Sequence, residues 1–382
     1  MYPISMDHPG NRGILNKMEY QSAAFSELIG NVDSVCSSRR GPVLNGKPVG
    51  RYPITGRGFN SFNHYVLFYS HVARYVETGD YDFLYIRYPF ALPNFLEFLR
   101  KAKRANPRVT IVLEIATFPY HRELQTPKQR ILGMFDALGH GRLKNHVDAI
   151  VTFYGQAEIF GVPCIQLRNG VDVQRIHLRD AVRSDDQFSM IAVGNLAERH
   201  GLDRVLRGMA RYVRQPGAKR TTLHVVGDGP ALADLTALAV ELGIDDHVRF
   251  HGIKSGPDLD AVFDDADIAL DSLAIHRLHL PSSSSLKARE YCARGIPFVL
   301  ASDDPDFPPQ LRFVHRIPSS DAPLDVSALI EFHAQLRQTT PTVHQEMRYY
   351  AEKHLTWKAK LEPLVHYLQE ESIGERFEEH SR

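Results

Sequence analysis

The sequence predicts an α/β protein with two doubly wound parallel sheets, each of the Rossmann-like type. Three observations lead to this prediction. The chain has 382 residues, which is longer than one hydrophobic core usually serves, so two domains are expected. Short apolar strands alternate with helical segments in both halves, which is typical of parallel sheets with crossover helices. A turn at 169–172 and a polar stretch up to Gln187 separate the two series.

The composition is that of a soluble globular protein. Apolar residues make up 43% of the chain and charged residues 24%, which argues against disorder. The 45 basic and 45 acidic residues balance, so no overall field attracts nucleic acid. The first residues lack the basic start and apolar core of a signal peptide, and no apolar run approaches the roughly 18 residues of a membrane span. A cytoplasmic protein is expected, with attachment to the inner face of the cytoplasmic membrane left open.

The first domain is expected at 1–168. Its turn-rich loop 7–13 precedes a helix from Ile14 to Leu28, and this loop could either let a ligand approach the backbone or be a plain turn. Residues 39–63 are rich in Gly, Pro, Arg and Asn and predict a long irregular loop. Two further helices are expected at 63–78 and 95–105, and strands at 82–88, 109–115, 148–153 and 163–167.

Two side chains stand out near the end of the strand 109–115. Glu114 is a carboxylate in a buried strand, which is costly unless it is paired or functional. His121 belongs to the loop that follows. Because ligands bind at the carboxyl ends of parallel strands, both are candidates for catalytic or acceptor contacts, and structural roles stay equally open. The basic helix face from Arg100 to Arg104 could contact anionic lipid or simply be solvated.

The second domain is expected at 169–342, where the alternation restarts. Strands are expected at 189–193, 221–226, 248–250 and 267–270, with a further apolar strand after Gly295, and helices at 202–212, 231–242 and 258–265. Residues 343–382 are expected to form C-terminal helices that pack back towards the first domain, with a charged tail that frays.

A serine run, Ser282 to Ser285, leads into a short helix that contains Glu290 and ends at Gly295. The start of a helix leaves unpaired backbone N–H groups and a positive dipole end, which together suit a phosphate. Serine is also the ordinary N-cap residue, so capping alone is the alternative interpretation.

The second half resembles the donor-binding domain of the family 4 glycosyltransferases. The motifs that carry the resemblance follow the family's order: NGVD at 169–172, GNL at 194–196 with HG at 200–201, VVGDGP at 225–230, VRFHG at 248–252, DAD at 265–267 and LKAREYCARGIP at 286–297. The first half is more loosely similar, at 12–17, 85–89 and 114–120, to a branch that makes bacterial capsule and exopolysaccharide. The resemblance implies the GT-B architecture, with an acceptor-binding and a nucleotide-sugar-binding domain facing each other across a cleft.

The resemblance also implies a reaction. A retaining enzyme of the hexosyltransferase type would move a sugar from a nucleotide-diphosphate-sugar to a hydroxyl of a lipid-linked or growing surface glycan, with no metal and no other cofactor. The sequence has no D-x-D signature beside a plausible site, and the acidic cluster 303–306 is expected to be a turn. Two alternatives stay open, namely a nucleotide-sugar epimerase of the same fold and a non-catalytic nucleotide-sugar-binding protein.

The resemblance places the diphosphate at the backbone of the serine loop and the ribose hydroxyls at Glu290, a carboxylate that accepts two hydrogen bonds. The donor-binding residues expected on this basis are Gly13, Gly194, Asn195, Arg199, His200, Gly227, Gly229, Ser282, Ser284, Ser285, Leu286, Lys287 and Glu290.

The sequence departs from the family pattern at three positions. Ser282 stands where the first motif glutamate is expected, His200 where the family has a basic residue before the glycine, and Asn195 where arginine is common. A protonated histidine can offset a diphosphate, whereas a neutral one cannot. Arg199 or Lys287 is therefore expected to supply the missing charge.

Overall fold

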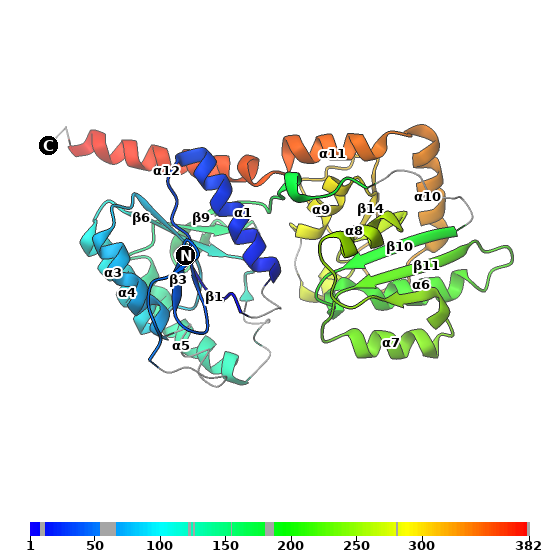
Figure 1. The fold of residues 1–382 in the computed structure, drawn as a ribbon, viewed down its shortest axis with the longest axis horizontal. Helices are drawn as coiled ribbons and strands as arrows, with labels where there is room; N and C mark the ends of the chain where they lie inside the picture. Colours follow the sequence, from blue (N-terminus) through cyan, green and yellow to red (C-terminus); the bar gives the residue numbers. More distant parts are fainter. Residues whose placement is uncertain are drawn as a thin grey trace. The chain divides into compact units, whose positions relative to one another are not determined.

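The computed structural model describes residues 1–7, 12–53, 66–120, 124, 127–153, 155–179, 187–279 and 282–379. The chain forms two compact units (Figure 1). The first unit comprises Met1–Arg168 together with Lys360–Arg382, and the second comprises Asn169–Ala359. Each unit is built on a parallel β-sheet.

The second unit holds a sheet of six strands, all paired in parallel in the order β12-β11-β10-β13-β14-β15. The strands are β10 (Gln187–Val193), β11 (Arg220–Val226), β12 (Val248–Phe250), β13 (Ile268–Leu270), β14 (Phe298–Leu300) and β15 (Val314–Arg316). The chain passes from β10 to β11 and β12 on one side, then returns to β13 on the other. This reversal next to β10 is the switch point at which ligands bind in sheets of this type.

Helices cover both faces of this sheet. Along β10, Met190 and Ala192 join one hydrophobic cluster while Ile191, between them, joins the other, since successive strand residues point to opposite faces. One cluster includes α6 (Leu202–Tyr212), α7 (Leu232–Glu241) and the start of α10 (Val326–Thr339); the other includes α8 (Pro257–Asp264), α9 (Leu286–Arg294) and α11 (Val343–His354). Short 3-10 helices occupy Val173–Arg175, Glu198–His200, Asp245–His247 and Ile275–Leu278.

The C-terminal residues from 343 on are divided between the two units. Helix α11 packs on α9 in the second unit, where Met347 and Ala351 are fully buried. Helix α12 (Trp357–Glu379) begins in the second unit, and from Lys360 its residues belong to the first. Helix α11, part of the segment 343–382 that was expected to pack towards the first domain, thus packs within the second unit, because the apolar side of α11 has its complement on α9.

The first unit contains a five-stranded and a four-stranded sheet. The larger has the order β5-β6-β7-β9-β8 and is parallel except for β8, which runs antiparallel to β9. Its strands are β5 (Phe83–Arg87), β6 (Thr110–Ile115), β7 (Ala149–Thr152), β8 (Glu158–Ile159) and β9 (Val162–Gln166). The smaller sheet contains β1 (Tyr2–Ser5), β2 (Val35–Ser37), β3 (Pro42–Leu44) and β4 (Lys47–Pro48).

Helices α3 (Phe68–Thr78) and α4 (Pro93–Ala105) pack on one face of the larger sheet. Helix α1 (Arg12–Ile29) contacts residues of the opposite face, because Phe25 packs against the ring of Tyr85 and Lys17 bonds to Glu114. Helix α5 (Pro127–Leu143) follows β6.

Several features of the first unit differ from the sequence prediction, which did not include the short strands β1, β2 and β8. The region 39–63, expected to be irregular, contains the hairpin of β3 and β4, whose turn uses positive φ angles at Asn45 and Gly46. Residues 54–63 of that loop lie outside the described part. Helix α5 was not predicted, because apolar residues occur on both its buried and its exposed sides and leave no single stripe to detect.

Candidate functional site

Two glycine turns meet at the carboxyl ends of β10 and β11. Gly194 has a φ of +148° and Gly227 a φ of +126°, a region that favours glycine. A Cβ at Gly227 would overlap the carbonyl oxygen of Gly194, and one at Gly229 would overlap the backbone of Leu196. The glycines at 227 and 229 are thus needed for the close approach of the two loops. Exposed Asn195 lies against Gly229 in this contact.

The start of α9 faces the first of these turns. A Cβ at Gly194 would lie 3.7 Å from Cδ of Lys287 and 3.9 Å from Cε1 of His200. Three of the expected donor-binding positions, Gly194, His200 and Lys287, therefore converge in space, although Lys287 is far from the other two in the sequence. The helical geometry leaves the N–H groups of the first turn, including those of Leu286 and Ala288, without helical acceptors.

The serine loop that precedes α9 is fixed by its own hydrogen bonds. Ser285 is the N-cap: its hydroxyl oxygen accepts from the N–H of Lys287 at 3.2 Å and the hydroxyl donates to Asp271 Oδ1 at 2.6 Å. The hydroxyl of Ser284 accepts from the N–H of Asn169 at 2.9 Å. Ser283 donates its N–H to the carbonyl of Asp303, and Ser282 forms a bridge with the same residue. The capping interpretation is confirmed for Ser285, and both hydroxyls expected to assist at the phosphate already have protein partners.

Lys287 is the cation nearest to the glycine turn. Its Nζ lies 3.1 Å from the hydroxyl of Ser272 and 3.6 Å from Asp271 Oδ1, and its side chain is 18% exposed. Burial lowers the pKa of Lys287, Asp271 opposes this effect, and the positive charge of Arg199 adds to it. Arg199 itself is half-buried and makes no ion pair with any residue that the structure describes.

His200 is a neutral histidine. Burial lowers its pKa to about 2, and the positive charges of Lys287 and Arg199 contribute to the shift. Its Nδ1 accepts a hydrogen bond from the N–H of Ala197, with 3.2 Å between the two nitrogens, so the ring carries its proton on Nε2. A protonated His200, one of two states that the sequence leaves open, is thus not the one found here. Neutral His200 can offer one N–H donor, and the positive charge beside the turn comes from Lys287 and Arg199.

Glu290 lies one turn after Lys287 on α9. Its Oε1 accepts from Nε and Nη2 of Arg294, both at 2.9 Å, and the side chain remains 32% exposed. Arg294 is in turn held by Asp260 at 2.6 Å. One carboxylate oxygen of Glu290 is therefore oriented by the protein, while Oε2 has no hydrogen-bond partner within the described chain and is available to a ligand.

Two further residues of this site were missed in the sequence. Asp271 and Ser272 follow β13, so they lie at the same carboxyl edge as the glycine turns. Asp271 is 1% exposed, and its Oδ2 has no hydrogen-bond partner among the described residues. The rule that drew attention to Glu114, a carboxylate at a strand end, would also have found Asp271.

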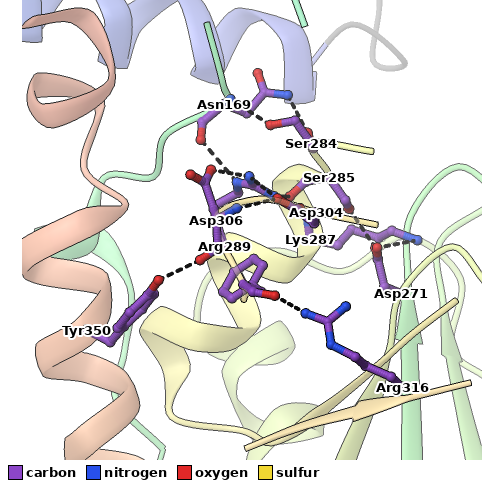
Figure 2. A network of polar contacts seen from close by, with 11 residues as sticks. Asn169, Asp271, Ser284, Ser285, Lys287, Arg289, Asp304, Asp306, Arg316 and Tyr350 are labelled. Carbon is purple, nitrogen blue, oxygen red and sulfur yellow. Dashed lines mark hydrogen bonds and ion pairs between the residues drawn. The ribbon is translucent and has the colours of Figure 1, made fainter. Parts of the chain in front are cut away.

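A buried ion-pair network centred on Arg289 contacts the serine loop (Figure 2). Arg289 is fully buried, pairs with both Asp304 and Asp306, and donates to the carbonyls of Asn169 and Ser285 at 3.1 Å each. Asp304 and Asp306, expected as parts of a simple turn, do lie in a turn, but their side chains are buried partners of Arg289. The network links Asn169, where the second unit begins, to the loop at the start of α9.

Three of the predicted site residues, Glu114, Gly13 and His121, belong to the first unit. Glu114 is completely buried, and its two oxygens accept from Lys17 at 3.0 Å, Arg87 at 2.9 Å, Gln21 at 3.0 Å and Tyr85 at 2.6 Å. This is a structural ion-pair cluster, one of the two roles open for Glu114, and neither oxygen is left for a substrate. Gly13 lies in the first turn of α1 rather than in a loop and is exposed. His121 lies outside the described residues.

The Glu114 cluster predicts a dependence of stability on acid. Burial would raise the pKa of Glu114, but Lys17 and Arg87 outweigh it and, with two hydrogen bonds, hold the pKa at about 2 instead of 4.5. Since the pKa is lowered on folding, the stabilisation is present above about pH 4.5 and is lost as the pH falls towards 2. Amide hydrogen exchange of β6, corrected for intrinsic rates, should therefore accelerate as the pH falls below about 4.5.

Two variants test this assignment. Glu114→Gln should make β6 exchange faster at neutral pH and remove the additional acceleration in acid. Glu97→Gln, which breaks the exposed ion pair with Arg100 on α4, is the control and should keep the wild-type profile. An acid response of the Glu114 variant equal to that of wild type would show that another carboxyl group is responsible.

Comparison with known proteins places these observations in a family context. Residues 174–310 match the family model described as glycosyl transferases group 1. The matched segment lies within the second unit. A D-inositol 3-phosphate glycosyltransferase of Saccharomonospora viridis is 34% identical over 146 residues, which cover 35% of this chain and 32% of that protein. The chain thus spans about a third of the length of this curated relative.

Solved structures extend the comparison to both units. A glycosyltransferase from Rickettsia africae has a TM-score of 0.63 at 9% identity, covering 96% of this chain and 97% of that one. Sucrose-phosphate synthase from Thermosynechococcus elongatus gives 0.62 at 14%, covering 96% and 94%. HepE from Anabaena, solved with UDP and glucose, gives 0.59 at 13%, covering 97% and 98%. At these identities the likeness concerns the fold, which is α/β of the GT-B type as expected from the sequence.

Proposed function

We propose that the protein is a retaining glycosyltransferase that uses a nucleotide-diphosphate-sugar and acts without a metal ion. The observation that carries this proposal is the convergence of Gly194, His200 and Lys287 at the carboxyl edge of the second sheet, with Glu290 one turn further along α9. The glycine turn leaves room near the backbone, the lysine supplies charge, and the carboxylate supplies a hydrogen-bond acceptor. All three lie within the segment 174–310 that matches the glycosyltransferase model.

The proposed reaction transfers the sugar, through its anomeric carbon, from the diphosphate to the acceptor hydroxyl. The acceptor oxygen forms a bond to this carbon on the face from which the diphosphate departs. The bond between the carbon and the diphosphate oxygen breaks, and its electron pair leaves with the diphosphate. The acceptor's proton is taken up by the departing diphosphate, so the atoms and charges balance.

Stabilising the departing diphosphate is the main task of the protein in such a step. Lys287 and Arg199 supply two positive charges beside the glycine turn, and the N–H groups at the start of α9 add the positive end of a helix dipole. His200 contributes a neutral Nε2–H donor. The start of α9 is fixed before the ligand binds, because Ser285 caps the helix and Arg289 holds the serine loop in place. They provide the charge that a metal ion would supply in other enzymes.

For the donor and the acceptor we propose chemical classes rather than individual compounds. Solved structures of HepE contain UDP, UDP-glucose, or UDP and glucose, so UDP and its sugars are the first probes to use. We propose a glycan or lipid-linked acceptor of the kind used in capsule or exopolysaccharide assembly, and peripheral contact of the protein with the inner face of the cytoplasmic membrane. Among the helices of the described chain, none is long and apolar enough to cross a bilayer.

A non-catalytic nucleotide-sugar-binding protein is the second candidate, favoured by Ser282. This residue stands where the family has a glutamate that contacts the donor sugar, and its backbone bridge to Asp303 fixes it in that place. Incubation with a panel of nucleotide-sugars and membrane extract, followed by mass spectrometry, separates the two candidates. Release of free nucleoside diphosphate supports transfer, whereas binding without any turnover supports the second candidate.

The position of the ribose is tested by Glu290→Ala. Since hydrogen bonds to charged groups contribute about 1.5–3 kcal/mol, the affinity for a nucleoside diphosphate should fall at least tenfold. Glu241→Ala, an exposed glutamate on α7 of the same unit, is the matched control and should bind like wild type. Isothermal titration calorimetry with UDP and other nucleoside diphosphates measures the difference. An unchanged affinity of the Glu290 variant would mean that the ribose lies elsewhere.

A further inference from the structure

Helix α5 of the first unit exposes a continuous set of large apolar side chains. Ile131, Met134, Phe135 and Leu138 are 55%, 71%, 55% and 77% exposed. Their spacing of three, four and seven residues puts them on one face of the helix. Four of the exposed large apolar side chains of the described chain thus lie within eight positions, which is a patch rather than scattered exposure. We call these four residues the α5 patch.

The opposite side of α5 is firmly seated in the unit. Asp136 is 1% exposed and accepts from the hydroxyls of Tyr88 and Tyr120 and, at 2.6 Å, from the N–H of Ala91. Gly139 lies so close to Ala91 that a Cβ would overlap its carbonyl oxygen. Because these contacts fix the rotation of the helix, the α5 patch must point away from the core of its own unit. Figure 1 shows α5 at the periphery of the first unit.

Apart from the buried Asp136, the charged residues of the segment that carries the patch have one sign. The sequence 127–144 contains four basic residues, Lys128, Arg130, Arg142 and Lys144, and one acidic residue, the buried Asp136. Arg142 continues the exposed face one turn beyond Leu138, and both Arg142 and Lys144 are exposed without an ion-pair partner in the part of the chain described. An exposed apolar helix face with basic flanks and no exposed acid on the same helix is suited to insertion into an anionic membrane interface.

Helix α4, the basic helix for which the sequence left lipid contact open, has the opposite character. Arg100 pairs with Glu97 at 2.6 Å, Lys103 with Asp148 at 2.8 Å, and Lys101 lies 3.6 Å from Glu77. Its large apolar side chains, Phe95, Leu96, Phe98 and Leu99, are all buried. The charges of α4 are thus largely balanced by carboxylates, and the helix has no large apolar side chain to insert into a bilayer.

We propose that the α5 patch docks the protein on a bilayer containing anionic lipids. The patch is a convex helix face, and a lipid interface can close around such a face without a preformed groove. The flanking cations complement anionic headgroups, at about 1 kcal/mol for each basic residue near the surface. Docking would also bring a membrane-bound acceptor close to a cavity of about 750 Å³, which Met134 and Tyr120 help to line beside the carboxyl end of β6.

This proposal deepens the proposed function by assigning the surface that meets the membrane. Its test needs no sugar transfer, so either proposal can fail while the other stands. The full chain is mixed with vesicles of phosphatidylcholine alone or with 30% phosphatidylglycerol, and floated through a density gradient. We expect flotation with the anionic vesicles, reduced by salt, and at least about tenfold weaker partitioning of Met134→Glu/Leu138→Glu.

The matched control is Val240→Glu/Ile253→Glu. It replaces two apolar residues of the second unit, 61% and 72% exposed, and changes the net charge by the same amount. It should float like wild type. Two results would overturn the proposal: wild type that stays with the soluble fraction, or equal partitioning of the two double variants. Sedimentation velocity without lipid adds a third, since a dimer that the α5 variant abolishes, with no flotation, would identify the patch as a self-association surface.

Discussion

Replacing Lys287 with alanine is expected to weaken the binding of a nucleoside diphosphate about 100-fold. Its Nζ belongs to a mostly buried group of polar atoms with Ser272 and Asp271, beside the turn at Gly194. Truncating one partner of a buried charged contact costs about 2–5 kcal/mol, and 2.7 kcal/mol corresponds to a factor of 100. Calorimetric titration with UDP, and with other nucleoside diphosphates if UDP does not bind, measures the loss.

The interpretation of this variant depends on its effect on the fold. Removing Lys287 leaves Asp271 buried beside no cation, so the double variant Asp271→Asn/Lys287→Ala keeps the pair electrically neutral. It should fold like wild type and still bind weakly. Lys254→Ala removes an exposed lysine of the same unit and should bind normally. If the double variant retained wild-type affinity, the charge that meets the diphosphate would have to come from Arg199 alone.

Replacing Arg289 with leucine is expected to destabilise the second unit by about 3–5 kcal/mol. The substitution leaves the buried carboxylates of Asp304 and Asp306 without their cation, and removing one partner of a buried ion pair has this effect. The carbonyls of Asn169 and Ser285 would also lose a donor. Trp357, the single tryptophan, lies in this unit and is 4% exposed, so its fluorescence during urea unfolding follows the second unit.

Arg277 provides a control of matching chemistry. It also pairs with two carboxylates, Asp203 at 2.8 Å and Asp321 at 2.7 Å, but near the surface, where Asp321 is 68% exposed. Arg277→Leu should therefore cost less than about 1 kcal/mol. Adding Asp304→Asn and Asp306→Asn to Arg289→Leu should restore part of the lost stability. Equal destabilisation by the Arg289 and Arg277 variants would mean that the buried network does not hold the serine loop.

Several elements of the fold follow from local patterns that the sequence displays. Strand β12 is predicted at its observed bounds, Val248–Phe250, because a short apolar run stands between turns. Helix α9 begins after Ser285 and ends at Gly295, whose φ is +70°, as capping chemistry predicts. The sequence did not predict elements that lack a regular spacing of apolar residues, such as the short strands β3 and β4 and helix α5, which has apolar residues on both sides.

The sequence by itself determined the α/β class, the positions of the glycine turns and the placement of a carboxylate and a lysine on α9. These depend on turn chemistry, periodicity and caps, which act over a few residues. Only the tertiary structure decided the state of His200, the pairing of Arg289 with Asp304 and Asp306, and the enclosure of Glu114. Burial and charge partners decide such properties, and the partners come from distant parts of the chain. Exposure of the α5 patch belongs to the same group, because it depends on which side of the helix meets the sheet.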